Sequence, residues 1–257
     1  MLVKSAPLIF LLVLSLAQES KASIQSGRPG QAIGAGVLEA GFLQMQTGVE
    51  QFKYNGMIHE VSVDSASNVI RLGLNQRFEL SAAFNYQKLN SRNTEVEDLK
   101  GLNTFNLGFR SLINNKQRGV LPQMAIQTRF KLKAVNENYR AKAVAPLITL
   151  SALHKMPGEY ALLTNVGISF DGNGGDPHEF YVFNLSRTVN SKVSVFFEVF
   201  GNTEEQKSNL FIDTGFDYLL NNNMKLDFSG GWGNNESVQA LFVSIGFSVR
   251  AKVFSKI

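Results

Sequence analysis

The sequence predicts an all-β fold, a transmembrane up-and-down antiparallel β-barrel of about 12 strands that follows a cleaved signal peptide. Three observations predict it. Apolar and polar residues alternate with period two, the alternating segments run to about 10 to 13 residues, and the connections between them alternate in length. Globular strands cluster near 5 or 6 residues, whereas a tilted strand that crosses a bilayer needs about 9 to 11.

The composition excludes several classes of protein. The chain has 257 residues, of which 44% are hydrophobic and 18% charged, and it contains no Cys. The absence of Cys removes disulfide scaffolds, thiol catalysis and Cys-type zinc sites. The formal net charge of +4 is dispersed along the chain and is not clustered beside aromatic residues. Nucleic acid is therefore not expected as a partner.

Residues 1–22 have the features of a secretory signal peptide. Lys4 provides a basic start, Ala6–Ala17 is almost wholly apolar, and small residues precede a cleavage site after Ala22. The apolar stretch is about a dozen residues, too short for a spanning helix, which needs roughly 20. The mature chain is expected to begin with a periplasmic N-terminal segment at 23–35, followed by an outer-membrane barrel at 36–257.

The alternation is clearest in four segments, Phe78–Tyr86, Met124–Lys133, Met224–Trp232 and Leu241–Arg250. In each, one face is mainly apolar and the other carries charged, small polar or Gly residues. A soluble sandwich also alternates, but its inward face would be aliphatic on both sheets. A charged, Gly-bearing face predicts instead a lumen that water reaches, with the apolar face turned to lipid.

The loop lengths support the barrel. The expected strands are 36–48, 57–75, 77–89, 102–113, 121–133, 144–154, 159–170, 179–189, 192–201, 210–220, 224–233 and 238–250. Tight turns are expected near 75–76, 113–119, 155–158, 190–191 and 221–223, and longer polar connections near 49–56, 90–101, 134–143, 171–178 and 202–209. Short periplasmic turns opposite long extracellular loops are typical of outer-membrane barrels. An even strand count also leaves both termini on the periplasmic side.

Two local features refine this pattern. Asn residues recur at the tight turns, at Asn75, Asn190 and Asn221, and we expect them to supply the positive φ that tight hairpins need. In the second strand, Val61 and Val63 have the opposite parity to Ile70 and Leu72. This predicts either a bulge at 65–67 or two shorter strands.

An ordered set of segments adds a resemblance to a known family. The segments are Arg71–Leu80, Asn165–Gly167, Phe196–Asn202, Asp213–Leu220, Leu226–Gly233 and Gly246–Arg250. Together they resemble the outer-membrane transporter-like family linked to the meta-pathway of phenol degradation, over most of the mature chain. The resemblance implies no catalytic or binding residues to carry over.

The resemblance implies a monomeric barrel of the bacterial outer membrane with a transport role. Its partners would be outer-membrane lipid, a small-molecule solute, and the barrel-assembly machinery during insertion. Family members often end in an aromatic residue soon after the last strand, whereas this chain continues through Ala251–Ile257. The assembly signal is then expected at Phe254 or within Gly246–Val249.

No enzyme, cofactor or metal site is expected. The three histidines, His59, His154 and His178, lack metal-ligand spacing and a nucleophile motif. A lipid-modifying enzyme using His154 or His178 is a third and weaker hypothesis. The Gly/Asp-rich stretch 171–176 suggests calcium, but the twelfth residue from Asp171 is Val182, where an EF-hand loop needs Glu. We therefore interpret this stretch as an extracellular loop.

The candidate functional residues are charges expected to face the lumen. They form a basic group from adjacent strands, Arg110, Arg129, Lys131 and Lys133, and an acidic group from strands further round, Glu79, Glu198, Asp213, Asp217 and Asp227. In one interpretation they pair and fill the interior. In the other, a basic wall faces an acidic wall across a passage for polar solutes or ions.

Two functions are consistent with these features. The first is an outer-membrane channel or transporter for small solutes, which the resemblance suggests are hydrophobic or aromatic. The alternative is a structural or adhesive barrel with a filled lumen and loops that bind something outside. About a dozen strands lies between barrels filled with side chains and open 16-stranded porins, so a narrow or partly plugged passage is expected.

Overall fold

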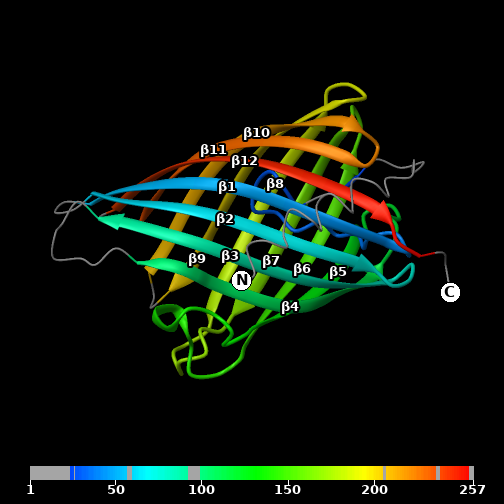
Figure 1. Cartoon of the computed structure of the whole chain (residues 1–257). Helices are drawn as coiled ribbons and strands as arrows, with labels where there is room; N and C mark the ends of the chain where they lie inside the picture. The colour runs from blue at the N-terminus through cyan, green and yellow to red at the C-terminus, as the bar shows by residue number, and fades with distance from the viewer. Residues whose placement is uncertain are drawn as a thin grey trace.

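The computed structural model shows a closed barrel and describes residues 24–25, 27–56, 60–91, 99–204, 207–235 and 238–254. The expected signal peptide lies outside these residues. The strands are β1 (Phe42–Gly56), β2 (Glu60–Gly73), β3 (Phe78–Ser91), β4 (Lys100–Asn114), β5 (Gln123–Lys131), β6 (Ala145–Met156), β7 (Tyr160–Ser169), β8 (His178–Thr188), β9 (Val193–Glu204), β10 (Lys207–Asn221), β11 (Met224–Asn235) and β12 (Val238–Lys252). Figure 1 shows them tilted around a common axis.

Each strand pairs antiparallel with its neighbours in the sequence, and β1 pairs with β12 to close the sheet. At this seam Phe42 lies opposite Lys252 at one end, and Gly56 lies opposite Val238 at the other. Closure satisfies the backbone hydrogen bonds of both edge strands, which is required where lipid surrounds the wall. The expected up-and-down barrel of 12 strands is confirmed.

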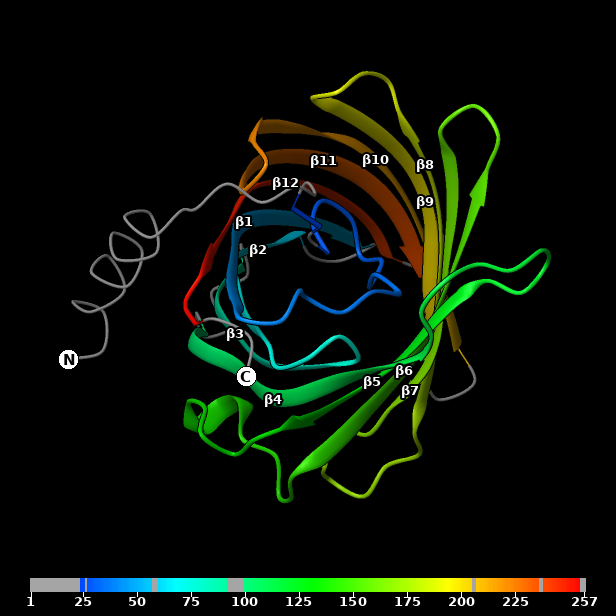
Figure 2. The same ribbon diagram turned by 90° about the vertical axis from the view of Figure 1, so that its right-hand side faces the viewer.

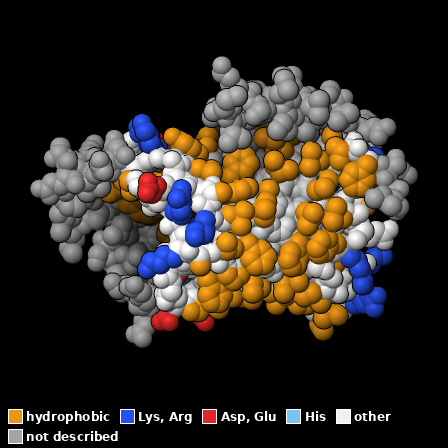
Figure 3. Space-filling view, turned by 60° about the horizontal axis from the view of Figure 1, so that its bottom comes forward, with side chains coloured by type: hydrophobic (Ala, Val, Ile, Leu, Met, Phe, Trp, Pro, Cys, Tyr) orange, Lys and Arg blue, Asp and Glu red, His pale blue; other side chains and the backbone are white. Residues whose placement is uncertain are grey.

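The outside of the barrel is apolar around its middle. Large exposed hydrophobic side chains occupy outward-facing positions on nearly every strand, among them Leu80, Leu107, Ile126, Ile148, Val166, Phe183, Phe197, Phe216, Phe228, Trp232 and Val243. Figure 3 shows this belt, with charged side chains gathered towards the two ends. An apolar band between polar rims is the exterior of a membrane-spanning barrel. Among the described residues, no helix is long and apolar enough to cross a bilayer.

The expectation of a bulge at 65–67 or of two shorter strands was wrong. β2 is continuous and pairs with both β1 and β3 without a register shift. Ile70 and Leu72 share the outward parity, whereas Val61 and Val63 share the parity of the lumen-facing residues, paired with Tyr54 and Phe52 of β1. The apolar parity changes because Val61 and Val63 lie beside lumen-facing aromatic residues of β1, so no bulge is needed.

Some segments that were expected to be loops are β-strand in the structure. Residues 49–56 belong to β1, and 202–209 belong to β9 and β10 apart from 205–206, which lie outside the described residues. The first strand begins at Phe42 and not at residue 36. These strands continue past the apolar belt because their residues go on alternating between lumen and exterior. The long connection expected at 134–143 is present, and it includes the short 3-10 helix η2 (Glu137–Tyr139).

The recurrent turn Asn residues stabilise the hairpins through their side chains. The Oδ1 atom of Asn75 accepts a hydrogen bond from Arg77 N, that of Asn190 from Lys192 N, and that of Asn221 from Asn223 N, each at 2.8 Å. Among the described non-Gly residues, only Glu159 has a positive φ. The expectation of positive φ at Asn was therefore wrong, since these residues form Asx turns instead.

Candidate functional site

Residues 24–25 and 27–41, which precede β1, lie inside the barrel, and we call them the plug. Figure 2, viewed along the barrel from the end at which β12 finishes, shows this blue trace within the ring of strands. It starts at that rim, where Ile24 N donates to Asn222 O at 2.9 Å, and returns there at Gly41, whose N donates to Gly73 O. The described plug residues include 24–25 and 27–35 of the segment expected at 23–35.

The plug follows the inner wall and is held mostly through its backbone. Gln31 N and Ala32 N donate to the Glu198 carboxylate of β9 at 2.6 and 3.1 Å, and Ile33 N donates to Asn165 Oδ1 of β7 at 2.6 Å. Further round, Leu38 N donates to Glu79 Oε2 of β3 at 2.6 Å. Buried carboxylate and amide oxygens thereby satisfy backbone donors that have no secondary-structure partner.

Arg28 anchors the plug to the seam of the barrel. Its guanidinium donates to Asp227 at 3.1 Å, to Glu50 at 3.2 Å and to Ser244 at 2.5 Å. Gly48 and Gly246, which lie opposite each other on β1 and β12, make the slot for this group. A Cβ at either position would overlap the guanidinium. The two glycines are therefore required by the close approach of Arg28.

A second ionic cluster holds the returning part of the plug. Arg71 Nη2 lies 2.7 Å from Glu79 Oε2, and Arg110 Nη1 lies 3.7 Å from Glu79 Oε1. Arg110 also donates to Gln127 at 2.6 Å and to the carbonyl of Gly36 at 2.9 Å. Glu79 is fully buried. Desolvated ion pairs of this kind stabilise only when the remaining polar atoms are satisfied, as most are here.

The structure places the predicted lumen charges as follows. Arg110, Arg129 and Lys131 share the lumen parity of β4 and β5 and form a basic wall with Arg71 of β2. The acids Glu198, Asp213, Asp217 and Asp227 lie on β9, β10 and β11, about half a turn away in the strand order. Glu79 does not join these acids, because it pairs with arginines in the basic wall. Lys133 follows the end of β5 and is exposed.

Several functional residues escaped prediction from the sequence. Glu50 and Arg71 have the lumen parity of their strands, so the same alternation could have found them. Arg28 could not be found in this way, because it lies in an irregular Gly-rich segment with no period to assign its direction. Asn165 is fully buried and donates to Ile33 O and Ser151 Oγ, both at 2.8 Å.

Beyond the plug, the lumen is lined by aromatic and aliphatic side chains, and we call this region the outer chamber. Its apolar lumen-parity residues are Phe52, Tyr54, Val61, Val63, Leu89, Phe180, Val182, Phe200, Phe211 and Phe242, and the polar residues Gln87, Asn202 and Asn209 share this parity. The rings of Phe52 and Phe242 stack with centroids 4.8 Å apart, and those of Phe200 and Phe211 with centroids 5.1 Å apart. A water-filled lumen is polar, so this aromatic cluster distinguishes the outer end of the lumen from the charged region around the plug.

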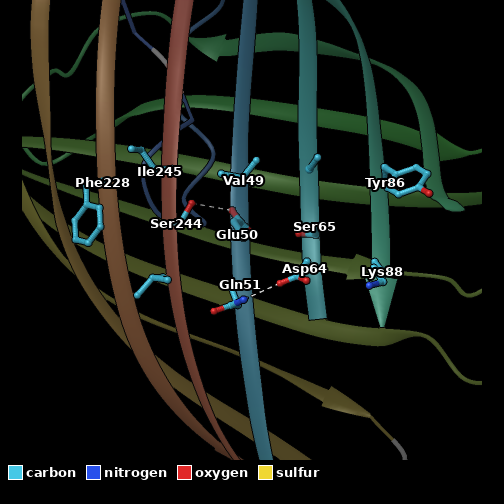
Figure 4. Close-up of a pocket in the computed structure, with 12 residues that line it drawn as sticks. Val49, Glu50, Gln51, Asp64, Ser65, Tyr86, Lys88, Phe228, Ser244 and Ile245 are labelled. Carbon is cyan, nitrogen blue, oxygen red and sulfur yellow. Dashed lines mark hydrogen bonds between the residues drawn. The ribbon is translucent and has the colours of Figure 1, made fainter. Parts of the chain in front are cut away.

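A depression of about 520 Å³ lies in the wall across β1, β2, β3, β11 and β12. Figure 4 shows Gln51 and Asp64 joined there by a hydrogen bond of 2.8 Å. Val49 and Tyr86 contribute its apolar side, and Lys88 lies opposite Asp64 across β2 and β3. Val49 and Tyr86 are apolar, whereas Gln51, Asp64 and Lys88 are polar. This change marks the boundary of the apolar belt at the end of the barrel away from Phe42.

The sequence matches the family described as "Putative MetA-pathway of phenol degradation" over residues 26–251. The chain belongs to this family. The match includes most of the plug as well as nearly all of the barrel, so both are part of the family's shared sequence. No curated protein sequence matches the chain.

Solved structures share the fold of this family member. The COG4313 outer membrane channel from Pseudomonas putida F1 has a TM-score of 0.67 at 9% identity, covering 89% of this chain and 100% of that chain. The TodX deltaS2S3 mutant monoaromatic hydrocarbon channel has a TM-score of 0.52 at 8% identity, covering 93% and 98%. The beta domain of the Bordetella autotransporter BrkA also has 0.52, at 10% identity, covering 82% and 99%. The structural similarity shows that this chain has the outer-membrane barrel fold. At such low sequence identity it does not by itself assign a function.

The remaining sequence candidates are surface features. His154 lies on β6, and its Nε2 is 3.1 Å from the carbonyl oxygen of Val120 in the turn before β5. His178 is the first residue of β8. Asp171 Oδ1 accepts a hydrogen bond from Asn173 N at 2.8 Å, and this bond lowers the pKa of its carboxyl. Among the described residues, no group of three or more His, Asp or Glu side chains could hold a metal ion.

Proposed function

We propose that this chain is a monomeric outer-membrane channel for small apolar solutes, aromatic ones in particular, which enter through the outer chamber. The observation that carries the proposal is the set of aromatic rings that face the lumen at the end away from the plug. Phe200 and Phe242 come from β9 and β12, with centroids 6.2 Å apart, so the chamber is lined across several strands. Aromatic faces and edges of this kind bind apolar rings.

The relatives support this solute class. The family is described by phenol degradation, and TodX is named a monoaromatic hydrocarbon channel. The COG4313 protein is named an outer membrane channel. None of these names decides the function of this chain. The family description and the TodX name agree with the aromatic lining of the outer chamber, and the COG4313 name agrees with a channel.

The plug limits what can pass. It is held to β1, β3, β7, β9 and β11 by the bonds described above, and Arg28 fills the space above Gly48 and Gly246. A wide aqueous pore is therefore not expected. Solutes that leave the outer chamber must pass beside the plug or displace part of it.

Uptake of radiolabelled toluene by cells that make the protein tests the proposal. We expect faster uptake than in cells without the protein, and slower uptake when Phe200 is changed to Ala. The matched control is Phe216→Ala, because Phe216 faces the lipid on the neighbouring strand β10. A heat-modifiable gel shift checks that each variant folds. Equal uptake with and without the protein would show that it is not a channel for this class.

A second candidate is a structural or adhesive barrel, and the plug favours it because it occupies the lumen. This candidate predicts no solute flux through the unmodified protein. The toluene uptake assay separates the two functions, since a channel should give faster uptake than cells without the protein and a structural barrel should not. Deletion of 171–178 should abolish surface binding only in the adhesive case.

A further inference from the structure

Asp213 of β10 has a buried carboxyl group that accepts no hydrogen bond from any residue that the structure describes. The residue is 3% exposed, and within the part of the chain that the structure describes neither Oδ1 nor Oδ2 has a donor. The other acids of this wall are engaged. Glu198 accepts two plug N–H groups, Asp227 binds Arg28, and Asp217 lies 3.5 Å from Lys225. A buried carboxyl group without a donor or cation is costly to ionise, and a ligand that supplies both would stabilise its charged form.

The neighbours of Asp213 are aromatic on the side of the outer chamber. In the hydrogen-bonded row across the sheet, Asp213 lies opposite Gly231, Gly231 lies opposite Phe242, and Phe242 lies opposite Phe52. A Cβ at Gly231 would lie 2.5 Å from both Asp213 Cβ and Phe242 Cζ. Gly231 therefore leaves the Phe242 ring and the Asp213 side chain adjacent to each other at the base of the chamber.

The charges around Asp213 are negative. Glu198 lies opposite it on β9, and Glu50 also adds a repulsive field at the carboxylate. Arg28, the cation of the plug, donates to Glu50 and Asp227, one or two rows nearer the periplasmic rim. A cation at Asp213 would thus gain from a carboxylate that is not already paired and from aromatic faces beside it.

We propose that the outer chamber is selective for aromatic solutes that carry an ammonium group, with Asp213 as their counter-ion. The inference rests on the proposed function and specifies its substrate class. The aromatic part of an arylalkyl amine would lie against the half-buried rings of Phe200 and Phe211, which contact each other, and Phe200 also contacts the buried Phe242. Its ammonium would donate to the Asp213 carboxylate. A neutral aromatic solute would gain only the first of these interactions.

Calorimetric titration of the full-length protein in lipid nanodiscs, with 2-phenylethylamine and 2-phenylethanol, tests this. The two probes have nearly the same shape and differ in charge. We expect the amine to bind about tenfold or more tightly than the alcohol in the unmodified protein. Asp213→Asn should remove this preference and leave the alcohol affinity unchanged. The matched control is Asp64→Asn, a carboxylate on the outer face of β2, which should keep the preference.

Each outcome decides a different claim. If the alcohol binds as tightly as the amine, or if Asp213→Asn keeps the preference, the ammonium selectivity is wrong and the aromatic channel stands. If neither probe binds and toluene uptake is absent, both proposals are wrong. If neither probe binds while toluene uptake persists, only the ammonium selectivity fails. The comparison of the two probes on the unmodified protein does not depend on whether Asp213→Asn folds.

Discussion

Arg28 places its Nε atom 3.1 Å from the Asp227 carboxylate on β11, although 199 positions separate the two residues in the sequence. The contact joins the segment before the barrel to one of its last strands. It therefore joins two segments that only the fold of the whole chain brings together. The side chain of Asp227 is fully buried, and that of Arg28 is 11% exposed, so solvent screens the pair weakly.

Arg28→Ala should destabilise the folded barrel. Removing one partner of a buried ion pair leaves Asp227 and Glu50 as buried charges and costs about 3–5 kcal/mol. Urea unfolding in lipid vesicles, followed by the heat-modifiable gel shift, measures the loss. Arg187→Ala is the control, because the Arg187 guanidinium lies over the exposed Tyr160 ring, 5.0 Å from its centroid, where the loss should be about 1 kcal/mol or less. Equal losses in the two variants would contradict the anchoring role of Arg28.

Glu198→Ala should loosen the middle of the plug. The backbone N–H groups of Gln31 and Ala32 would lose their acceptor, at a cost of about 1–3 kcal/mol for a buried group left unsatisfied. Hydrogen–deuterium exchange with mass spectrometry should show faster exchange in peptides that cover 27–36. Glu159→Ala changes an exposed turn residue and should leave that exchange unaltered. Unchanged exchange in Glu198→Ala would show that the barrel holds the plug by other contacts.

The adjacent glycines of β11 should differ in their tolerance of a methyl group. At Gly231 a Cβ would meet Asp213, Ile212 and Phe242 atoms at 2.5 Å, whereas at Gly230 the nearest atom is Phe242 O at 3.3 Å. Gly231→Ala should therefore destabilise by about 1–3 kcal/mol through overpacking. Gly230→Ala should have a much smaller effect, measured by the same unfolding assay. Similar stability of the two variants would show that the lumen near Asp213 is less tightly packed than the structure indicates.

The carboxyl of Asp171 should titrate below the ordinary range of aspartate. Its pKa is lowered mainly by the backbone hydrogen bond from Asn173. The ionised carboxyl therefore stabilises the folded loop at pH values above the unfolded-state pKa. This stabilisation is lost as the pH falls through the folded-state pKa. The amide resonance of Asn173 in an NMR pH titration should report this transition. Asp171→Ala should abolish it. A transition at or above the unperturbed aspartate pKa of about 3.9 would contradict the assignment.

Much of the fold is local in origin and could be predicted. Alternation over segments such as Phe78–Tyr86 assigns each side chain to lipid or lumen, because strand geometry fixes a period of two. Arg110, Asp213 and Asp227 are buried in the structure, at the parity that this rule assigns to the lumen. The rule failed for β2, because the assumption that apolar means outward does not hold where Val61 and Val63 lie beside lumen-facing aromatic residues.

The sequence by itself determined the wall of this protein: twelve strands, their order, and an exterior suited to lipid. Only the tertiary structure decided what lies inside the wall. The position of the plug depends on Arg28 reaching a slot at Gly48 and Gly246, and on Glu198 and Glu79 meeting its backbone. These partners are far apart in the chain and come together through closure of the sheet, which no local periodicity encodes. The environment of Asp213 arises in the same way. The plug binds the neighbouring acids Glu198 and Asp227, and among the described residues it gives no hydrogen bond to Asp213.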